Sequence, residues 1–152
     1  IGEAAFHVAC LIGGKFTVIT TLSRSIAAIE SNILKYGLER RCSGIRACEV
    51  PVLDLKEKRE EVYSKISTEI LKAIDDDRAD AVVLGCAGMT DWANTLTCEH
   101  GIPVVDGVAS AVGLISSLTK MGLKTSKQNS YAVPRSKTYL GVLSPFSPKM
   151  HD

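Results

Sequence analysis

The stretch Ala81-Val82-Val83-Leu84-Gly85-Cys86-Ala87-Gly88-Met89-Thr90 decides the fold. Its first four residues are apolar and include two β-branched valines, the next five are mainly small, and a polar helix start follows near Thr90. This order predicts a buried strand, a tight turn and the beginning of a helix. The turn places the thiol of Cys86 where the strand ends, and Gly85 and Gly88 let the backbone approach a bound molecule closely.

Cys86 has two interpretations. Exposed backbone N–H groups at the turn and the positive end of the helix dipole favour a thiolate, which is the reactive form of cysteine. The plainer interpretation is a small buried side chain that only packs. Flanking glycines at the end of a strand favour the functional interpretation.

The composition is that of an ordinary soluble globular protein. With 152 residues, a net charge of +1 and 45% hydrophobic residues, the chain can form one α/β domain with a real core. No basic stripe indicates nucleic-acid binding, and the apolar runs are too short or too interrupted to span a bilayer. Five cysteines without paired C-x-x-C units predict free thiols and a reducing, cytoplasmic compartment. The chain opens at Ile1 without a methionine, so the lack of a visible signal peptide carries little weight.

Helical and β-rich segments alternate along the chain. Apolar residues repeat with helical spacing in residues 2–13, from residue 23 or 25 to 36, from 54 onward and from 107 to 121. The predicted strands lie between these helices and are Lys15–Leu22, Cys42–Val50, Asp80–Gly85 and Ile102–Asp106.

Several polar residues stand at expected helix starts. Ser23 or Ser25 can cap the second helix, and Asp54 with Glu57 three residues later resembles a capping box. Asp106 ends the last strand, where capping of the following helix is a better interpretation than catalysis.

The alternation predicts a parallel sheet with helices on both faces. We expect a flavodoxin-like strand order, 2-1-3-4, in which the first strand lies beside the third. The carboxyl ends of these two strands carry Thr20-Thr21 and Gly85-Cys86-Ala87-Gly88. Ligands of such sheets bind outside these ends, at the point where the strand order reverses, so both stretches should line one crevice.

Other conspicuous residues have plainer interpretations. His7 and His100 are expected to be structural or surface residues, and Tyr63 and Trp92 are expected to pack. Asp75-Asp76-Asp77 reads as a polar connection before a strand rather than as a metal site.

Five stretches together carry a resemblance to a known family. They are Gly85–Met89 followed by Ile102–Val108, Gly2–Ala5 followed by Phe16–Thr21, and the tail from Lys124 to Tyr139. In this combination, over roughly residues 1–141, the chain resembles the hydantoin and allantoin racemase branch of the aspartate/glutamate racemase superfamily.

The resemblance implies a protein of two pseudo-symmetric α/β domains, each of which supplies one cysteine to the cleft between them. Cys86 matches the second of these cysteines, and the first would precede Ile1. The chain would then comprise a second α/β domain (residues 1–106), a helix that returns to the first domain (107–122) and a C-terminal arm (123–152).

The implied activity is racemisation of allantoin or a 5-substituted hydantoin by two cysteine bases, without a cofactor or metal. Cys86 would be catalytic, and the substrate would be bound by residues at the two strand ends, namely Thr20, Thr21, Gly85, Ala87, Gly88 and Met89. The other expected partners are the missing N-terminal domain and further copies in a homo-oligomer, with no nucleic acid and no membrane. This fragment alone would be inactive.

Two alternatives stay open at this point. A related decarboxylase or isomerase could use the same scaffold with a different set of cysteines. A non-catalytic α/β binding domain could carry Cys86 as an inert residue.

Overall fold

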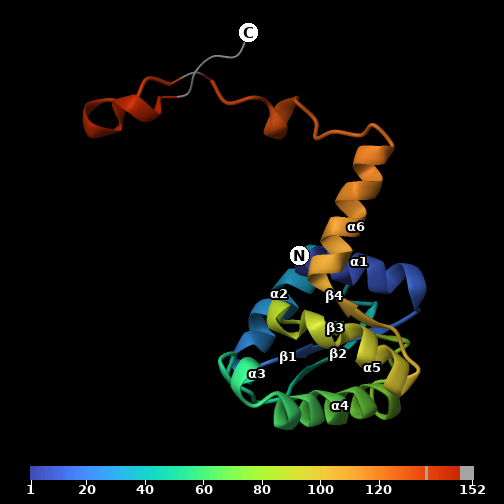
Figure 1. The fold of residues 1–152 in the computed structure, drawn as a ribbon. Coiled ribbons are helices and arrows are strands. Elements are labelled where there is room, and N and C mark those ends of the chain that lie inside the picture. Colours follow the sequence, from blue (N-terminus) through green and yellow to red (C-terminus); the bar gives the residue numbers. More distant parts are fainter. Residues whose placement is uncertain (136, 148–152) are drawn as a thin grey trace. The chain divides into compact units, whose positions relative to one another are not determined.

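A computed structural model describes residues 1–135 and 137–147. The chain forms two compact units, residues 1–117 and 118–152. In chain order the elements that build the first unit are α1 (Gly2–Ile12), β1 (Phe16–Thr20), η1 (Ser23–Ser25), α2 (Ile26–Lys35), β2 (Cys42–Ala47), α3 (Asp54–Glu57), α4 (Arg59–Asp75), β3 (Ala81–Leu84), η2 (Ala87–Trp92), α5 (Ala93–His100) and β4 (Val104–Asp106). Helix α6 (Gly107–Lys120) follows β4 (Figure 1).

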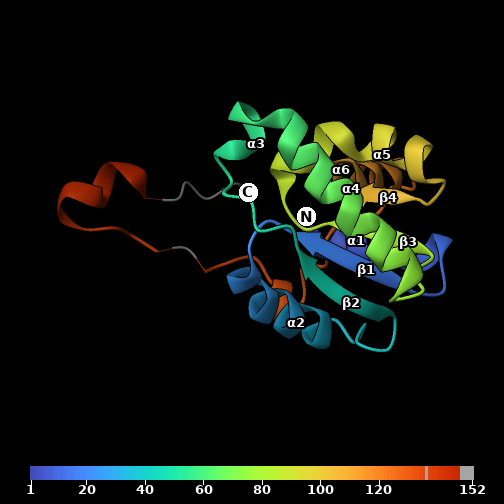
Figure 2. The ribbon, with the colours of Figure 1, turned by 90° about the horizontal axis from the view of Figure 1, so that it is seen from below.

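The four strands form one parallel sheet in the order β2-β1-β3-β4 (Figure 2). Strand β1 lies between β2 and β3, and Val18 is paired with Ile45 on one side and Val83 on the other. The predicted flavodoxin-like order is therefore confirmed, and the switch point lies between β1 and β3.

Helices cover both faces of the sheet, as the sequence predicted. Figure 2 shows α4 and α5 on one side and α2 on the other. On the α1 and α2 face the core includes Phe6, Val18 and Val83, whereas on the α4 and α5 face it includes Ile19 and Leu84, together with further apolar residues in each case. Because successive side chains of a strand point to opposite faces, each short strand contributes to both cores.

The strands are shorter than their apolar patterns suggested. Residues beyond the ladder remain hydrogen-bonded but leave the strand geometry: Cys48 N donates to Thr20 O at 3.0 Å and Val50 N donates to Thr21 O at 2.9 Å. Pro103 has no N–H to donate, and β4 begins only after it. Apolar composition thus continues past the point where regular pairing stops.

Two predicted helix starts are wrong in detail. The helix expected from Asp54 is two helices, α3 and α4, because the backbone at Lys58 (φ −123°, ψ 49°) is not helical. The carboxylate of Asp54 accepts a 3.0 Å hydrogen bond from Lys58 Nζ, and no side chain caps α3. Neither Ser23 nor Ser25 makes a capping hydrogen bond, since the chain enters α2 through the 3-10 turn η1.

The helix ends at Asp106, Gly37 and Gly122 follow the prediction. Asp106 Oδ1 accepts hydrogen bonds from Val108 N at 2.8 Å and Ala109 N at 2.9 Å, so Asp106 caps α6. Gly37 (φ +71°) and Gly122 (φ +72°) follow α2 and α6 in the left-handed region. Between β3 and α5, the helical backbone begins at Ala87 as a 3-10 turn, three residues earlier than expected.

The second unit contains two short 3-10 helices, η3 (Asn129–Tyr131) and η4 (Gly141–Phe146), with exposed side chains. It includes most of the predicted C-terminal arm, of which residues 136 and 148–152 lie outside the described residues. Over the described residues of the whole chain, the structure holds no helix that is both long and apolar enough to cross a membrane.

Candidate functional site

The carboxyl ends of β1 and β3 lie directly side by side. Gly85 N donates a 2.8 Å hydrogen bond to Ile19 O. A Cβ atom on Gly85 would lie 3.1 Å from Ile19 O and 3.3 Å from Thr20 Cβ, which is tighter than ordinary contact. Glycine therefore allows the close approach at this point without displacing its neighbours. The ends of β1 and β3 thus lie side by side at the switch point, as predicted, whereas a single crevice lined by both stretches stays a prediction.

Cys86 lies between the end of β3 and the start of η2. Its backbone is extended (φ −136°, ψ 128°), and its thiol is half-buried and not in a disulfide. The side chain packs against the core on the α4 and α5 face of the sheet. A half-buried thiol at a strand end remains within reach of a molecule bound at that edge.

The three residues after Cys86 differ in what they can offer. Met89 N donates a 3.0 Å hydrogen bond to Cys86 O, and the Met89 side chain is fully buried in the core. Ala87 and Gly88 occupy the first turn of η2, where amides lack partners within the helix. Within the described residues, no acceptor is found for either of these two amides. The turn thus offers two free N–H donors beside the thiol, while Met89 holds its shape.

Thr20 and Thr21 are buried, with 2% and 5% of their surfaces exposed. Their carbonyls accept the hydrogen bonds from Cys48 and Val50 described above. Over the described part of the chain, no hydrogen bond is found for either hydroxyl.

One segment that sequence reasoning did not assign to the site connects its two halves. Residues 48–55 leave β2, bind the carbonyls of Thr20 and Thr21 and then reach the cysteine turn. There Leu55 Cδ1 lies only 2.7 Å from the position that a Cβ on Gly88 would take. The available signal in the sequence was two apolar residues around Pro51, Val50 and Leu55, both of which are buried in the structure.

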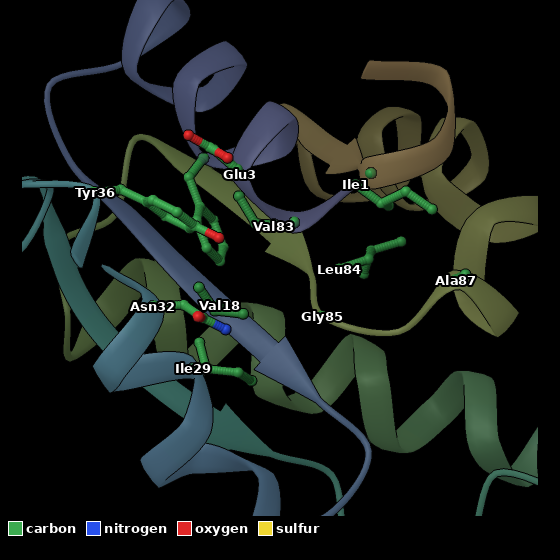
Figure 3. Close-up of a pocket in the computed structure, with 13 residues that line it drawn as sticks. Ile1, Glu3, Val18, Ile29, Asn32, Tyr36, Val83, Leu84, Gly85 and Ala87 are labelled. Atoms are coloured by element: carbon green, nitrogen blue, oxygen red, sulfur yellow. The ribbon is translucent and has the colours of Figure 1, made fainter. Parts of the chain in front are cut away.

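A pocket of about 270 Å³ adjoins the turn on the α1 and α2 face (Figure 3). Gly85 and Ala87 line it, whereas Cys86, Thr20, Thr21, Gly88 and Met89 do not. Its polar groups come from three residues that the sequence did not assign to a site or to a role, which are Glu3, Asn32 and Tyr36.

The residues predicted to be structural pack as expected. The rings of Tyr63 and Trp92 meet edge to face at 6.2 Å, and Ser67 Oγ lies 2.8 Å from His100 Nε2. His7 is exposed on α1. Among the described residues, no group of three His, Cys, Asp or Glu side chains is arranged to hold a metal ion.

The buried cysteines near the sheet are poor candidates for a base. Burial raises the pKa of the Cys42 thiol to about 11. Burial also raises the pKa of the Cys48 thiol above its ordinary value. Both thiols are therefore protonated at neutral pH, which makes neither a suitable base.

Known proteins similar to this chain are racemases. The model of the family described as Asp/Glu/Hydantoin racemase matches residues 1–115. A hydantoin racemase from Rhizobium meliloti is 44% identical over 141 residues, covering 93% of this chain and 58% of that protein. A hydantoin racemase from Pseudomonas sp. (strain NS671) is 35% identical over 146 residues, covering 96% of this chain and 59% of that protein.

Two solved structures share the fold. The allantoin racemase from Klebsiella pneumoniae has a TM-score of 0.88 and 34% identity, and the match covers 96% of this chain and 60% of that one. The allantoin racemase AllR from Pseudomonas fluorescens has a TM-score of 0.84 and 38% identity, covering 92% and 60% respectively. The chain thus spans about 58 to 60% of the length of these four relatives.

Proposed function

The chain belongs to the Asp/Glu/hydantoin racemase family, and from that membership we propose that the protein carrying it racemises allantoin or a 5-substituted hydantoin without a cofactor. Cys86 is one of the two bases in this proposal. The observation that carries it is the position of Cys86 two residues after the end of β3, at the switch point, beside the free amides of Ala87 and Gly88. Similar proteins that are hydantoin and allantoin racemases support the reaction class.

Inversion of a ring carbon needs a base on one face and an acid on the other. The thiolate of Cys86 removes the proton from C5 of one enantiomer and becomes a thiol. A second cysteine, present as a thiol, then gives its proton to the opposite face of the same carbon. For the other enantiomer the two cysteines exchange these roles.

Loss of the ring proton moves negative charge onto the adjacent carbonyl oxygen, which forms an enolate. The amides of Ala87 and Gly88 are the donors proposed to stabilise this oxygen, with the hydroxyls of Thr20 and Thr21 at the neighbouring strand end. One well-aimed donor contributes about 3 kcal/mol to transition-state stabilisation. Gly85 allows the close approach of the strand ends. The hydrogen bond from Met89 N to Cys86 O fixes the conformation of the turn.

The second cysteine is proposed to lie in a first domain that precedes Ile1. Residues 1–106 then form the second domain, residues 107–122 the helix that packs on the first domain, and residues 123–152 an arm. The length of the relatives supports this, since the chain covers only about 58 to 60% of them. The apolar side chains of Val108, Val112 and Ile115 are 37%, 62% and 64% exposed on α6, where a further domain could cover them.

The test is deuterium exchange in the complete protein that carries this chain. Wild-type protein should exchange the C5 proton for deuterium as it inverts each enantiomer. Cys86→Ser should abolish inversion, because a serine hydroxyl is not ionised at neutral pH. It should also abolish exchange from the enantiomer whose proton faces position 86, while exchange with retention persists from the other enantiomer.

Cys98→Ser is the matched control, since Cys98 is an exposed cysteine on α5. We expect this variant to racemise like the wild type. Near-wild-type inversion by Cys86→Ser would refute the two-base assignment. Equal slowing of exchange from both enantiomers would indicate that Cys86 only shapes the site.

A further inference from the structure

We propose that Leu55 is a positioning residue that fixes the thiol of Cys86 through Gly88. The inference rests on the proposed role of Cys86 as a base. Leu55 itself touches neither the substrate nor the reacting atoms in this proposal. Its role is to set where the sulfur lies.

The contact between Leu55 and Gly88 is the first step of the argument. A Cβ on Gly88 would lie 2.7 Å from Leu55 Cδ1 and 3.7 Å from Cys86 Sγ. Gly88 thus lies against the leucine methyl group and has the sulfur as its next neighbour. The backbone of the cysteine turn can approach Leu55 so closely only because residue 88 has no side chain.

Leu55 cannot move freely away from this contact. Its surface is only 3% exposed, and it belongs to the same core cluster as Met89, whose amide closes the turn onto the carbonyl of Cys86. Protein cores are close-packed, so a shift of a buried leucine moves its neighbours.

The segment that carries Leu55 is fixed to the other half of the site. Cys48 and Val50 donate to the carbonyls of Thr20 and Thr21, and Asp54 N donates to Pro51 O at 3.0 Å. Leu55 N in turn donates to Val52 O at 3.3 Å. Leu55 therefore connects the thiol to the end of β1. This connection is additional to the direct pairing of β1 with β3.

The position of the sulfur matters for the rate of proton removal. A base acts when it lies within about 3 to 3.5 Å of its partner, and a displacement of about 1 Å can cost about 100-fold in rate. Loss of the leucine should therefore lower kcat more than it changes KM, because the displaced groups, the thiol and the amide of Gly88, act on the transition state. The loss should be larger for the enantiomer that Cys86 deprotonates.

The experiment compares Leu55→Ala, Gly88→Ala and the double variant in the complete protein. Each single variant should lower kcat by about 10- to 100-fold, the first by removing the contact and the second by forcing the two groups apart. In the double variant the new methyl group enters the space that the leucine vacates. The fold-loss in kcat of the double variant should therefore be smaller than the product of the fold-losses of the two single variants.

Val62→Ala is the matched control, because Val62 is 2% exposed in the same core cluster but lies on α4. It should lower stability without changing the ratio of deuterium exchange rates from the two enantiomers. Leu55→Val, which removes less volume, should give the same asymmetry to a smaller degree and serves if Leu55→Ala does not fold. Equal slowing of both enantiomers by the Leu55 variants, with no recovery in the double variant, would overturn the inference.

A second readout does not depend on racemisation. The rate at which iodoacetamide modifies Cys86, followed by mass spectrometry of its peptide, should change in Leu55→Ala and Leu55→Val and stay unchanged in Val62→Ala. If Cys86→Ser retains racemase activity, the proposed function fails, and this alkylation rate still decides whether Leu55 positions the thiol. An unchanged rate in both Leu55 variants would refute the positioning role.

Discussion

Arg46 binds Asp77 through two hydrogen bonds, from Nε to Oδ2 at 2.7 Å and from Nη2 to Oδ1 at 2.6 Å. The hydroxyl of Thr17 donates a third, at 2.9 Å, to Oδ2. Arg46 lies on the edge strand β2, whereas Asp77 follows α4, so the pair joins the edge of the sheet to the end of a helix. The acidic run that the sequence identified only as a polar connection thus supplies a specific structural partner.

This pair should make stability depend on pH at the acid end. The hydrogen bonds from Arg46 hold the pKa of Asp77 below its ordinary value of 3.8. The contribution of the Arg46–Asp77 pair to stability is therefore fully present above that value. It is lost as the pH falls through the lower pKa that Asp77 has in the folded state. Arg46→Met should lower the free energy of unfolding by about 2 kcal/mol at pH 7, between the values for exposed and buried pairs.

Urea unfolding of both proteins at pH 7 and in steps down to the acid limit of folding measures the effect. The difference between wild type and Arg46→Met should shrink as the pH falls. Lys58→Met, which removes an exposed pair with Asp54, should have a much smaller effect at every pH. A difference for Arg46→Met that does not change with pH would show that packing, not the ion pair, causes the loss.

Gly107 should tolerate no side chain. A Cβ at this position would clash with Ile1 Cγ2 and lie 3.1 Å from Ile1 O, because the starts of α1 and α6 are in contact there. Gly107→Ala should therefore destabilise the protein by about 1 to 3 kcal/mol. Gly113→Ala on the same helix has nothing within 4 Å of its new methyl group and should stabilise it by about 0.4 to 1 kcal/mol. The Tm should fall in Gly107→Ala and rise in Gly113→Ala. Equal shifts of Tm in the two variants would contradict this prediction.

Arg41 should not be replaceable by lysine. Its Nε donates to Gly14 O at 2.7 Å, and its Nη2 donates to Cys10 O at 2.8 Å and Gly13 O at 2.6 Å, so one guanidinium satisfies three carbonyls at the end of α1. Lysine keeps the charge but not the planar fork. Arg41→Lys should cost roughly 2 kcal/mol of stability in chemical unfolding. Arg40→Lys, at an exposed neighbouring position, is the control and should change the midpoint little.

The sequence predicted the sheet because its signals are local and repeated. Alternating helical and β-rich segments fix a parallel sheet, and the Gly85–Gly88 turn marks the strand end that faces the site. Asp106 was identified as a cap for the same reason, since its partners lie two and three residues away. Features that depend on neighbouring residues in the chain were therefore accessible without a structure.

Long-range packing was not accessible in this way. The contact of Leu55 with Gly88 joins residues that are far apart in the chain, and no pattern in either segment announces it. The break at Lys58 is likewise invisible in a sequence that continues the helical period. The role of Met89 was misjudged because the sequence did not reveal that its amide already serves the carbonyl of Cys86.

Helix α6 provides the last test, which concerns the proposed first domain. Val112 is 62% exposed on this helix, and Ser117, five residues later, is also exposed but points about 140° away around the helix axis. If α6 packs on a first domain through its apolar residues, a charge at Val112 must be buried in that interface. An unpaired charge in an apolar contact costs several kcal/mol.

We expect the isolated 152-residue chain to show no racemase activity, because the proposal assigns half of the cleft and one base to the first domain. In the complete protein, Val112→Asp should lower racemisation of hydantoins, since a cost of about 2.7 kcal/mol already lowers the equilibrium constant for domain packing about 100-fold. Ser117→Asp adds the same charge to the same helix and should leave activity near that of the wild type. Racemase assays and limited proteolysis of the two variants measure activity and domain packing together. Substantial activity from the isolated chain, or from Val112→Asp, would mean that α6 does not join two domains of one active site.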